Sequence, residues 1–246
     1  MARKNNVIVG LGETGLSYAR FLVARNEDFV VVDDNPGEGN VMALREINPG
    51  ASVEEITAGC LLRADQIFIS PGVPLGHEAV SMARASGKDL YGDIQLFGEL
   101  AAAPIIGITG TNGKSTVSRL VFEMIRDQGN KVSVAGNIGT PCLDVLAEDV
   151  DFHVLEISSY QLELATELKT EVSVVLNLAP DHMDRYETEQ DYYQTKLGLY
   201  NNTTKAVINR SMSGELGDEL AAATFGAGVV PGNNNFGVSV QGKETW

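Results

Sequence analysis

Short apolar runs alternate with amphipathic stretches along the chain, which is the pattern of parallel strands joined by helices. Helical spacing is clearest in residues 117–125 and 188–201, and a β-hairpin is expected to begin in residues 236–246. This alternation predicts an α/β fold. The runs that we interpret as strands are residues 7–9, 29–32, 66–70, 105–108, 131–135, 152–157, 172–178, 205–209 and 224–226.

A glycine-rich turn follows the first apolar run. Gly10, Gly12 and Gly15 have G-x-G-x-x-G spacing there, and Asp33 and Asp34 end the second run about 20 residues later, where a dinucleotide-binding fold places its ribose-binding acid. On its own this pattern favours NAD. Glycines at such a turn also let the helix pack against the strand, so a nucleotide site and a purely structural turn are about equally favoured. The pattern predicts a Rossmann-like N-terminal domain.

A second turn, after the run at residues 105–108, carries stronger chemistry. Its sequence is GTNGKST, residues 110–116, and it lies where a strand becomes a helix. Its glycines let the backbone approach a phosphate, which the free N–H groups and dipole of a helix N-terminus favour. Lys114 is expected to neutralise phosphate charge, and Ser115 or Thr116 to hold Mg²⁺. Ile108 replaces the first glycine of the general pattern, so we predict a variant P-loop that binds ATP.

Ligand-type side chains follow further strands of this second α/β unit. Glu156 stands in an apolar run, where a carboxylate is costly unless it is paired or binds a metal, and its position after an ATP loop suggests the acid that holds Mg²⁺. His182 follows the next strand, and we expect it to contact a metal or a phosphate. Lys196 shares an apolar helical stripe with Tyr193 and Leu197, so its side chain is expected to face inward.

Composition and charge exclude several functions. The 246 residues are 43% hydrophobic and carry a formal net charge of −15, which argues against a nucleic-acid surface. Cys60 and Cys142 lie far apart and give neither a disulfide framework nor a zinc spacing, as expected in a reducing cytoplasm. The start does not resemble a signal peptide, and no run approaches the ~20 apolar residues of a membrane helix. We therefore expect a cytoplasmic protein that binds neither nucleic acid nor membrane.

Seven motifs, in order, resemble those of one family, the ATP-dependent Mur ligases of peptidoglycan synthesis. The resemblance spans most of the chain and is nearest to the members that add D-glutamate to UDP-N-acetylmuramoyl-L-alanine. The motifs are GLGETGLS (10–17), SPGV (70–73), GDIQLF (92–97), GTNGKST (110–116), GNIG (136–139), LEISSYQLE (155–163) and DHMDRY (181–186).

The resemblance implies both an activity and a domain plan. ATP would phosphorylate the alanyl carboxylate, and the amine of D-glutamate would attack the acyl phosphate to give an amide, ADP and phosphate. Residues 1–92 would form the Rossmann-like domain that binds the UDP substrate, and residues 93–246 the first part of an incomplete P-loop domain. Family members continue with a C-terminal domain of about 100–150 residues, an ordinary domain size. Because that domain supplies D-glutamate and adenine contacts, residues 1–246 alone are expected to be an inactive monomer.

The motifs also assign site residues. The catalytic residues would be Lys114, Glu156, His182 and Lys196. Ser115 and Glu156 would bind one Mg²⁺, and His182 a second together with Lys196, since a lysine at this position of the family is typically carbamylated. The ATP loop is Gly110, Thr111, Asn112, Gly113, Lys114, Ser115 and Thr116. The residues expected to meet the UDP substrate are Gly12, Glu13, Thr14, Gly15, Asp33, Asp34, Ser70, Pro71, Gly72, Asn137, Ser158, Ser159 and Gln161.

Three alternative functions remain open at this point. A nicotinamide oxidoreductase would use the first glycine turn and Asp33, but it gives the GTNGKST turn no role. A folylpolyglutamate synthase-like ligase shares the central motifs but lacks the Rossmann opening. The chain is also compatible with a nucleotide-binding module that has no ligase activity.

Overall fold

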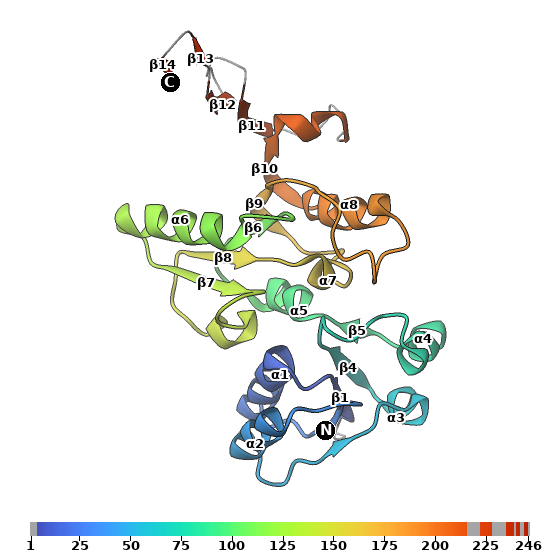
Figure 1. Ribbon diagram of the computed structural model, residues 1–246. Coiled ribbons are helices and arrows are strands. Elements are labelled where there is room, and N and C mark those ends of the chain that lie inside the picture. Colours follow the sequence, from blue (N-terminus) through green and yellow to red (C-terminus); the bar gives the residue numbers. More distant parts are fainter. Residues whose placement is uncertain (1–3, 216–221, 228–234, 239, 242–243, 246) are drawn as a thin grey trace. The chain divides into compact units, whose positions relative to one another are not determined.

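The computed structural model describes residues 4–215, 222–227, 235–238, 240–241 and 244–245. It divides into unit 1, residues 1–100 with 139–147, and unit 2, residues 101–138 with 148–246. The main sheet of each unit is parallel throughout its described strands, which confirms the predicted α/β class (Figure 1). Among the residues described, no helix is both long enough and apolar enough to cross a membrane.

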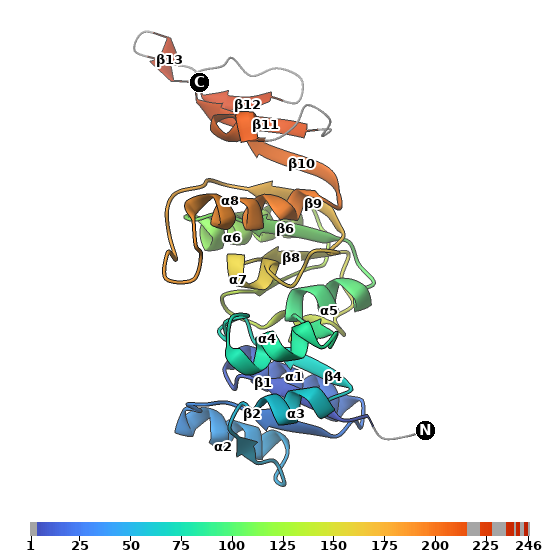
Figure 2. The same cartoon turned by 90° about the vertical axis from the view of Figure 1, so that its right-hand side faces the viewer.

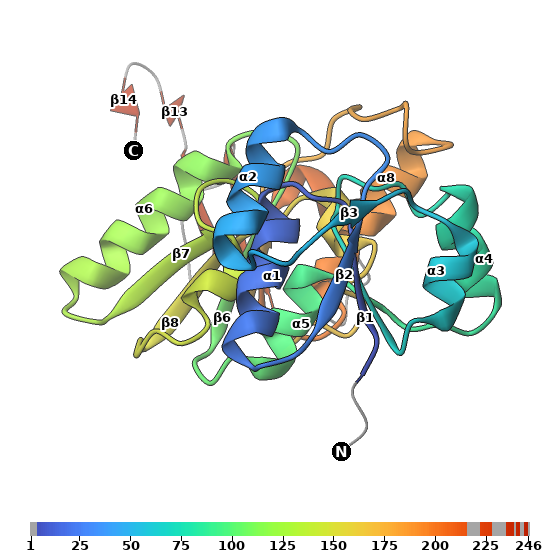
Figure 3. The same cartoon turned by 90° about the horizontal axis from the view of Figure 1, so that it is seen from below.

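Unit 1 is a parallel sheet with helices on both faces. Its strands are β1 (Asn6–Val9), β2 (Phe29–Val32), β3 (Val53–Glu54), β4 (Gln66–Ile69) and β5 (Leu90–Tyr91), in the order β3-β2-β1-β4-β5. Its helices are α1 (Glu13–Ala24), α2 (Glu38–Ile47), α3 (Ala58–Arg63), α4 (Glu78–Ala85) and α5 (Asp93–Leu100). Figure 3 shows α1 and α2 on one side of β1 and β2, with α3 and α4 on the other. This covering of both faces explains the uninterrupted burial of β1.

A short segment from the second half of the sequence completes unit 1. Residues 139–147, with the 3₁₀ turn η1 (Cys142–Val145), pack on α1 and α5. Asp144 accepts a 2.8 Å hydrogen bond from the hydroxyl of Ser17 and two more from the guanidinium of Arg20. Unit 1 thus includes α5 and residues 139–147, which both come after residue 92 in the sequence. The expected domain boundary between residues 92 and 93 stays a prediction.

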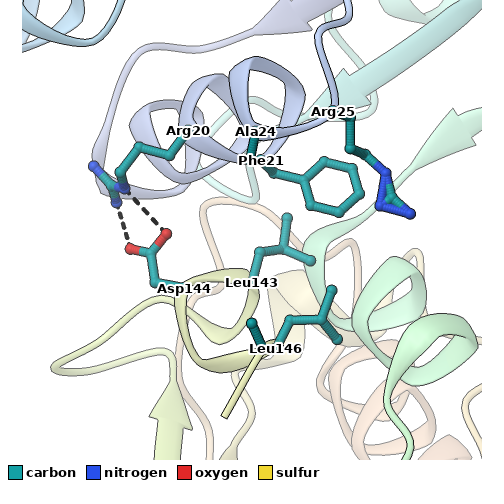
Figure 4. Close-up of a pocket in the computed structure, with 8 residues that line it drawn as sticks. Arg20, Phe21, Ala24, Arg25, Leu143, Asp144 and Leu146 are labelled. Carbon is teal, nitrogen blue, oxygen red and sulfur yellow. Dashed lines mark hydrogen bonds and ion pairs between the residues drawn. The ribbon is translucent and has the colours of Figure 1, made fainter.

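The same segment has an apolar contact with α1. Figure 4 shows Phe21 of α1 facing Leu143 and Leu146, with the Arg20–Asp144 ion pair at one end. The side chains line a groove of about 640 Å³. Residues 139–147 are therefore held to α1 by the ion pair and the Ser17 hydrogen bond, and apolar side chains of both segments line the groove beside them.

Unit 2 contains a seven-stranded sheet among its described residues, in the order β12-β11-β10-β9-β6-β8-β7. Its strands are β6 (Ile105–Thr109), β7 (Val132–Gly136), β8 (Phe152–Glu156), β9 (Thr170–Val175), β10 (Thr203–Asn209), β11 (Ala222–Ala227) and β12 (Asn235–Val238). Its helices are α6 (Lys114–Asp127), α7 (Ser159–Leu162) and α8 (Glu189–Leu197), followed by the 3₁₀ turns η2 (Gly198–Tyr200) and η3 (Arg210–Glu215). The strand before the P-loop, β6, lies inside the sheet between β9 and β8.

Alternate side chains of β9 pack on opposite faces of this sheet. Val174 belongs to the apolar cluster that includes Ile108 and side chains of α6, whereas Val175 belongs to the cluster of Leu197 and Tyr200. Figure 2 shows α8 on the near face of the sheet and α6 behind it. The period-two pattern of a strand buried on both faces thus explains the apolar run at residues 172–178.

All nine predicted strands are present, and the differences lie in short elements. Two strands of two residues each, β3 and β5, were not predicted, because so short a segment has no readable period. We expected a β-hairpin to begin at Phe236. This prediction is wrong at that residue, because β12, which contains Phe236, pairs in parallel with β11. An antiparallel pair, β13 (Val240–Gln241) with β14 (Glu244–Thr245), follows it, while residues 239, 242–243 and 246 lie outside the described residues.

Candidate active site

The P-loop connects β6 to α6 and owes its shape to two glycines. Gly110 has φ +148°, and a Cβ there would lie 3.0 Å from the Cβ of Leu176, so the loop needs glycine for both conformation and space. Gly113 has φ +83° and caps α6. The first N–H groups of α6 have no intrahelical partner, and they open onto the carboxyl edge of the sheet. This cradle fits the phosphates of a nucleotide.

Asn177 holds the P-loop from the neighbouring strand. Its side chain accepts a 2.9 Å hydrogen bond from the N–H of Asn112 and donates one of 2.9 Å to the carbonyl of Asn112. Its own carbonyl accepts from the N–H of Thr111 at 3.0 Å. Sequence reasoning missed this residue, although a polar side chain just after the buried strand β9 was a signal.

Lys114 begins α6 and folds back over its own loop. Its ammonium donates to the carbonyls of Gly110 at 2.9 Å and Thr111 at 3.0 Å. Ser115 and Thr116, in the same first turn, are exposed. A phosphate at the helix N-terminus would therefore meet a lysine and two hydroxyls that the fold already holds in the first turn.

Glu156 ends β8, beside β6, and is only 3% exposed. Its carboxylate accepts a 3.2 Å hydrogen bond from the side-chain amide of Asn137, whose own N–H donates to the Glu156 carbonyl at 2.8 Å. Gly136 makes this close approach possible, because a Cβ there would lie 2.1 Å from the Glu156 carbonyl oxygen. Asn137 and Glu156 thus form one polar pair at the carboxyl edge of the sheet.

Lys196 faces inward, as predicted, and is 1% exposed. Its ammonium donates to the Gly110 carbonyl at 3.1 Å, the carbonyl that also accepts from Lys114, and lies 4.8 Å from the centre of the Tyr192 ring. Burial, and then repulsion from Lys114, lower the pKa of Lys196 to about 7, while Asp181 acts in the opposite direction. The uncharged amine is therefore well populated near neutral pH.

The predicted stripe around Lys196 needs one correction. Tyr192, four residues before Lys196, is buried, whereas Tyr193 is only half-buried. Tyr192 and Lys196 are four residues apart, so the helical repeat places them on the same face of α8. The buried face of α8 that contains Lys196 therefore includes Tyr192 and Leu197.

His182 lies in the exposed loop between β9 and α8. It has φ +56°, and its ring stands 4.8 Å from that of Tyr160 and 6.1 Å from that of Tyr192. Its Nε2 lies 3.6 Å from a carboxylate oxygen of Asp181. The same aromatic ring of Tyr192 therefore neighbours both His182 and Lys196, which brings these two predicted residues to one side of the P-loop.

Ser158, Ser159 and Gln161 take structural positions in α7. Ser158 and Gln161 form a capping box: the Ser158 hydroxyl accepts from the N–H of Gln161, and the Gln161 side chain accepts from the N–H of Ser158. Ser159 and Gln161 are buried. The side chains that were expected to meet substrate thus fix the start of a short helix beside the site.

The first glycine loop, in unit 1, is held by its neighbours. Asp33 accepts a 2.6 Å hydrogen bond from the N–H of Leu11, and Ser70 donates one of 2.8 Å to the carbonyl of Gly10. Gly15 is required for packing, because a Cβ there would lie 2.1 Å from the Gly10 carbonyl oxygen. The loop conformation therefore accounts for Gly10, Gly15, Asp33 and Ser70 without any ligand.

Other residues of this edge remain open to a ligand. Gly12 and Gly72 have free space around them, and Glu13 and Thr14 are accessible at the start of α1. Asp34 accepts from the N–H of Ile56 and lies 3.1 Å from the imidazole Nε2 of His77. Pro71 follows Ser70 in the turn after β4. The α1 N-terminus fits an anionic group such as a diphosphate.

Two family models match the chain. One, described as Mur ligase MurD-like, N-terminal domain, matches residues 4–92, and the other, described as Mur ligase middle domain, matches residues 108–231. Among curated proteins, the UDP-N-acetylmuramoylalanine--D-glutamate ligase of Pseudomonas syringae pv. tomato is 41% identical over 97% of this chain. The protein of the same name from Nitrosococcus oceani is 40% identical over 98% of it. The chain spans about half the length of these relatives, 54% of each.

Solved structures with a similar fold belong to related ligases. The UDP-N-acetylmuramate:L-alanyl-gamma-D-glutamyl-meso-diaminopimelate ligase of Neisseria meningitides matches 91% of this chain and 78% of its own, with a TM-score of 0.62 and 20% identity. The UDP-N-acetylmuramate-alanine ligase of Thermotoga maritima matches 90% of this chain and 52% of its own, with a TM-score of 0.55 and 18% identity. At these identities the likeness is one of fold.

Proposed function

Because the chain belongs to the Mur ligase family, we propose that it carries the substrate-binding and ATP-binding parts of a ligase that joins D-glutamate to UDP-N-acetylmuramoyl-L-alanine. The observation that carries the proposal is the similarity, over 97% of the chain, to a relative named for that reaction. A P-loop on the same sheet edge as a buried carboxylate and a buried lysine supports it, because a ligase of this kind must bind ATP beside an acyl group.

The proposed reaction has two steps. The alanyl carboxylate takes the γ-phosphoryl group of ATP, and the amine of D-glutamate then displaces phosphate from the acyl phosphate to form the amide. Bound Mg²⁺ would neutralise negative charge on the phosphate oxygens. No protein nucleophile is needed, so the task of this chain is to bind the reacting groups and to orient them.

The ATP part of the proposal rests on the P-loop and on Glu156. The ammonium of Lys114 would turn from its own loop carbonyls to the phosphates, which offer it full negative charge. Ser115, with Thr116 beside it, and Glu156 would hold the first Mg²⁺, since hydroxyl and carboxylate oxygens suit a hard cation. Asn137, already bonded to Glu156, would orient that carboxylate or meet the substrate.

Lys196 and His182 would hold a second Mg²⁺. An uncharged lysine amine reacts with CO₂, and the resulting carbamate is an anion whose oxygens suit Mg²⁺. The burial of Lys196 and the repulsion from Lys114, which together favour the uncharged amine, support this assignment. A bound cation would in turn stabilise the carbamate. The rival, an ammonium that reaches solvent, is less compatible with 1% exposure.

The UDP moiety would bind at the edge of unit 1 where α1 begins. Gly12, Glu13 and Thr14 would offer backbone N–H groups to the diphosphate, and Asp34 with Gly72 would face the uridine. Asp33 and Ser70 would act indirectly, by holding the glycine loop. Ser158, Ser159 and Gln161 would define the shape of the acyl pocket through α7. The reaction would take place in the cytoplasm and the protein would be a monomer.

Calorimetric titration with two ligands tests the substrate class. UDP-N-acetylmuramoyl-L-alanine should bind the chain and NAD should not, and Gly12→Asp should abolish the binding by placing a carboxylate at the α1 N-terminus. Gly37→Asp is a matched control, because Gly37 precedes α2 and also has no backbone strain. Tight NAD binding without a response to the UDP ligand would overturn the proposal.

Chemical rescue tests the role of Lys196 in an enzyme that carries the rest of the family's length. Lys196→Ala should lose amide formation, and added short carboxylates should restore part of it by replacing the carbamate. Lys196→Arg should stay inactive, because a guanidinium does not form a carbamate. Full activity of Lys196→Ala would contradict the assignment.

A further inference from the structure

We propose that Glu163 and Arg185 are positioning residues for His182: their partly buried ion pair fastens the loop of residues 181–186 to the end of α7 and so fixes where the His182 imidazole stands. The inference rests on the proposed function only for the role of His182 as a ligand. Neither Glu163 nor Arg185 was among the site residues expected from the sequence.

The ion pair is closed and well shaped. Arg185 donates to the two carboxylate oxygens of Glu163, from Nε at 3.1 Å and from Nη2 at 2.6 Å, and the two side chains are only 11% and 15% exposed. The guanidinium carbon also lies 4.2 Å from the centre of the Tyr160 ring. A two-pronged arginine bond of this kind fixes orientation as well as distance, unlike a single surface contact.

A backbone turn connects this anchor to His182. The His182 carbonyl accepts from the N–H of Arg185 at 3.0 Å and from the N–H of Tyr186 at 3.3 Å. The position of the guanidinium therefore determines the position of the histidine backbone three residues earlier. Because the Tyr160 ring lies under the guanidinium and also contacts the imidazole at a tilt, it connects the anchor directly to the His182 ring.

His182 needs such an anchor. It has φ +56°, a conformation that a residue with a Cβ adopts only when its surroundings impose it, and residues 180–184 are all exposed. The start of the loop is tied separately, because Thr111 of the P-loop donates to the carbonyl of Ala179 and accepts from its N–H, each at 3.1 Å. With the loop tied to the P-loop at one end and to α7 at the other, the imidazole is held near the phosphate cradle before any ligand arrives.

The three histidines of the chain make the proposal measurable by NMR of the metal-free protein. The rings of Tyr160 and Tyr192 should displace the His182 Hε1 signal from its random-coil position. His153 is a buried residue of β8 that bonds to Ser133 of β7 and reports on the fold of unit 2, and His77 reports on unit 1. A His182→Gln variant assigns the signal.

Arg185→Met and Glu163→Gln should each move the His182 signal most of the way to the random-coil position, with the His153 signal unchanged. Arg185→Lys should give an intermediate position, because a lysine keeps the charge but makes only one of the two bonds. Arg119→Met, which removes an exposed ion pair of α6 with Glu123, is the matched control and should move nothing. Should Arg185→Met also disturb His153, the milder Glu163→Gln and Arg185→Lys decide the question.

An unmoved His182 signal in Glu163→Gln, with His153 intact, would overturn the proposal. The ligand role of His182 is tested separately, by adding Mn²⁺ with ADP to the wild-type chain and measuring the paramagnetic broadening of the three histidine signals. Absence of broadening at His182 would contradict its role as a metal ligand. That outcome would not change the effect of the Glu163 and Arg185 variants on the His182 signal. A failure of the ligand role is therefore distinguishable from a failure of the positioning role.

Discussion

Replacement of Lys196 by Met should make the stability of unit 2 less dependent on pH. Methionine is apolar and similar in length, so Lys196→Met keeps the packing of the site while it removes the ionisable group. In the folded protein the pKa of Lys196 is lowered to about 7, first by burial and then by Lys114. The unfolded chain therefore binds more protons than the folded chain between about pH 7 and pH 10.5, and the free energy of unfolding must rise with pH over that range.

The size of the effect follows from the same shift. One pKa unit corresponds to about 1.4 kcal/mol. A lysine with a pKa of about 7 instead of 10.5 thus destabilises the fold by about 5 kcal/mol at acidic pH, about 4 kcal/mol at pH 7 and about 2 kcal/mol at pH 9. Lys196→Met should therefore be more stable than the wild type at pH 7, although the loss of the hydrogen bond from the amine to the Gly110 carbonyl reduces this gain. The advantage of the variant should shrink by about 2 kcal/mol between pH 7 and pH 9.

Urea unfolding of both proteins at pH 7, 8 and 9 measures this advantage. The buffers must be free of CO₂, because a carbamate would change the number of bound protons. Subtracting the unfolding free energy of the wild type from that of the variant at each pH cancels the contribution of other groups. Cys142 is one of these groups, because burial raises the pKa of its thiol. As a direct measurement, the ¹³Cε shift of labelled Lys196 should titrate near pH 7. Parallel pH profiles for the two proteins, or a Lys196 midpoint near 10.5, would refute the reasoning.

Three further predictions concern the backbone and the loops. Gly136→Ala should lower the melting temperature sharply, because its Cβ would lie 2.1 Å from a backbone oxygen of β8, whereas Gly129→Ala, with φ +86° and open space, should cost only about 1–2 kcal/mol. Asn177→Ala should weaken binding of ATP with Mg²⁺ in a calorimetric titration by about tenfold or more, since the P-loop loses two side-chain hydrogen bonds of about 1 kcal/mol each; unchanged affinity would show that the loop holds itself. Asp33→Ala should weaken binding of the UDP ligand and lower thermal stability together, because the glycine loop loses its 2.6 Å anchor, and a loss of binding at unchanged stability would instead favour direct contact.

Hydrophobic runs were enough to predict nine strands, but not the two-residue strands β3 and β5. A strand buried on both faces has a long apolar run, and β6 and β8 have such runs, so both the strands and the polar residues at their carboxyl ends were readable. The inward direction of Lys196 was predictable for the same reason, since helical spacing determines which residues share a face. The choice between Tyr192 and Tyr193 was not predictable, because both lie within one helical turn of Lys196 and the spacing alone does not separate them.

Motif reasoning named candidate side chains but not the bonds that each of them makes in the fold. Ser158 and Gln161 lie in a motif of ligand-type residues, yet they bond to each other in a helix cap. Asp33 stands where a ribose-binding acid is expected, yet its carboxylate holds a backbone N–H. The type of a residue determines which bonds its side chain is able to form, but the fold determines whether a ligand or a neighbouring protein group is its partner. For that reason Asn177 and the Glu163–Arg185 pair were found only in the structure.

The segment of residues 139–147 determines the order in which the chain is able to fold. Because it leaves unit 2 after residue 138, packs on α1 and returns at residue 148, unit 1 is not a continuous piece of sequence. The bond from Ser17 to Asp144 spans 127 residues, and contacts so distant in sequence form slowly. During synthesis, the apolar flank of α1 at Phe21 stays uncovered until η1 has emerged, by which time β6 and β7 already exist. Unit 1 therefore reaches its final packing only after the first strands of unit 2 have been synthesised.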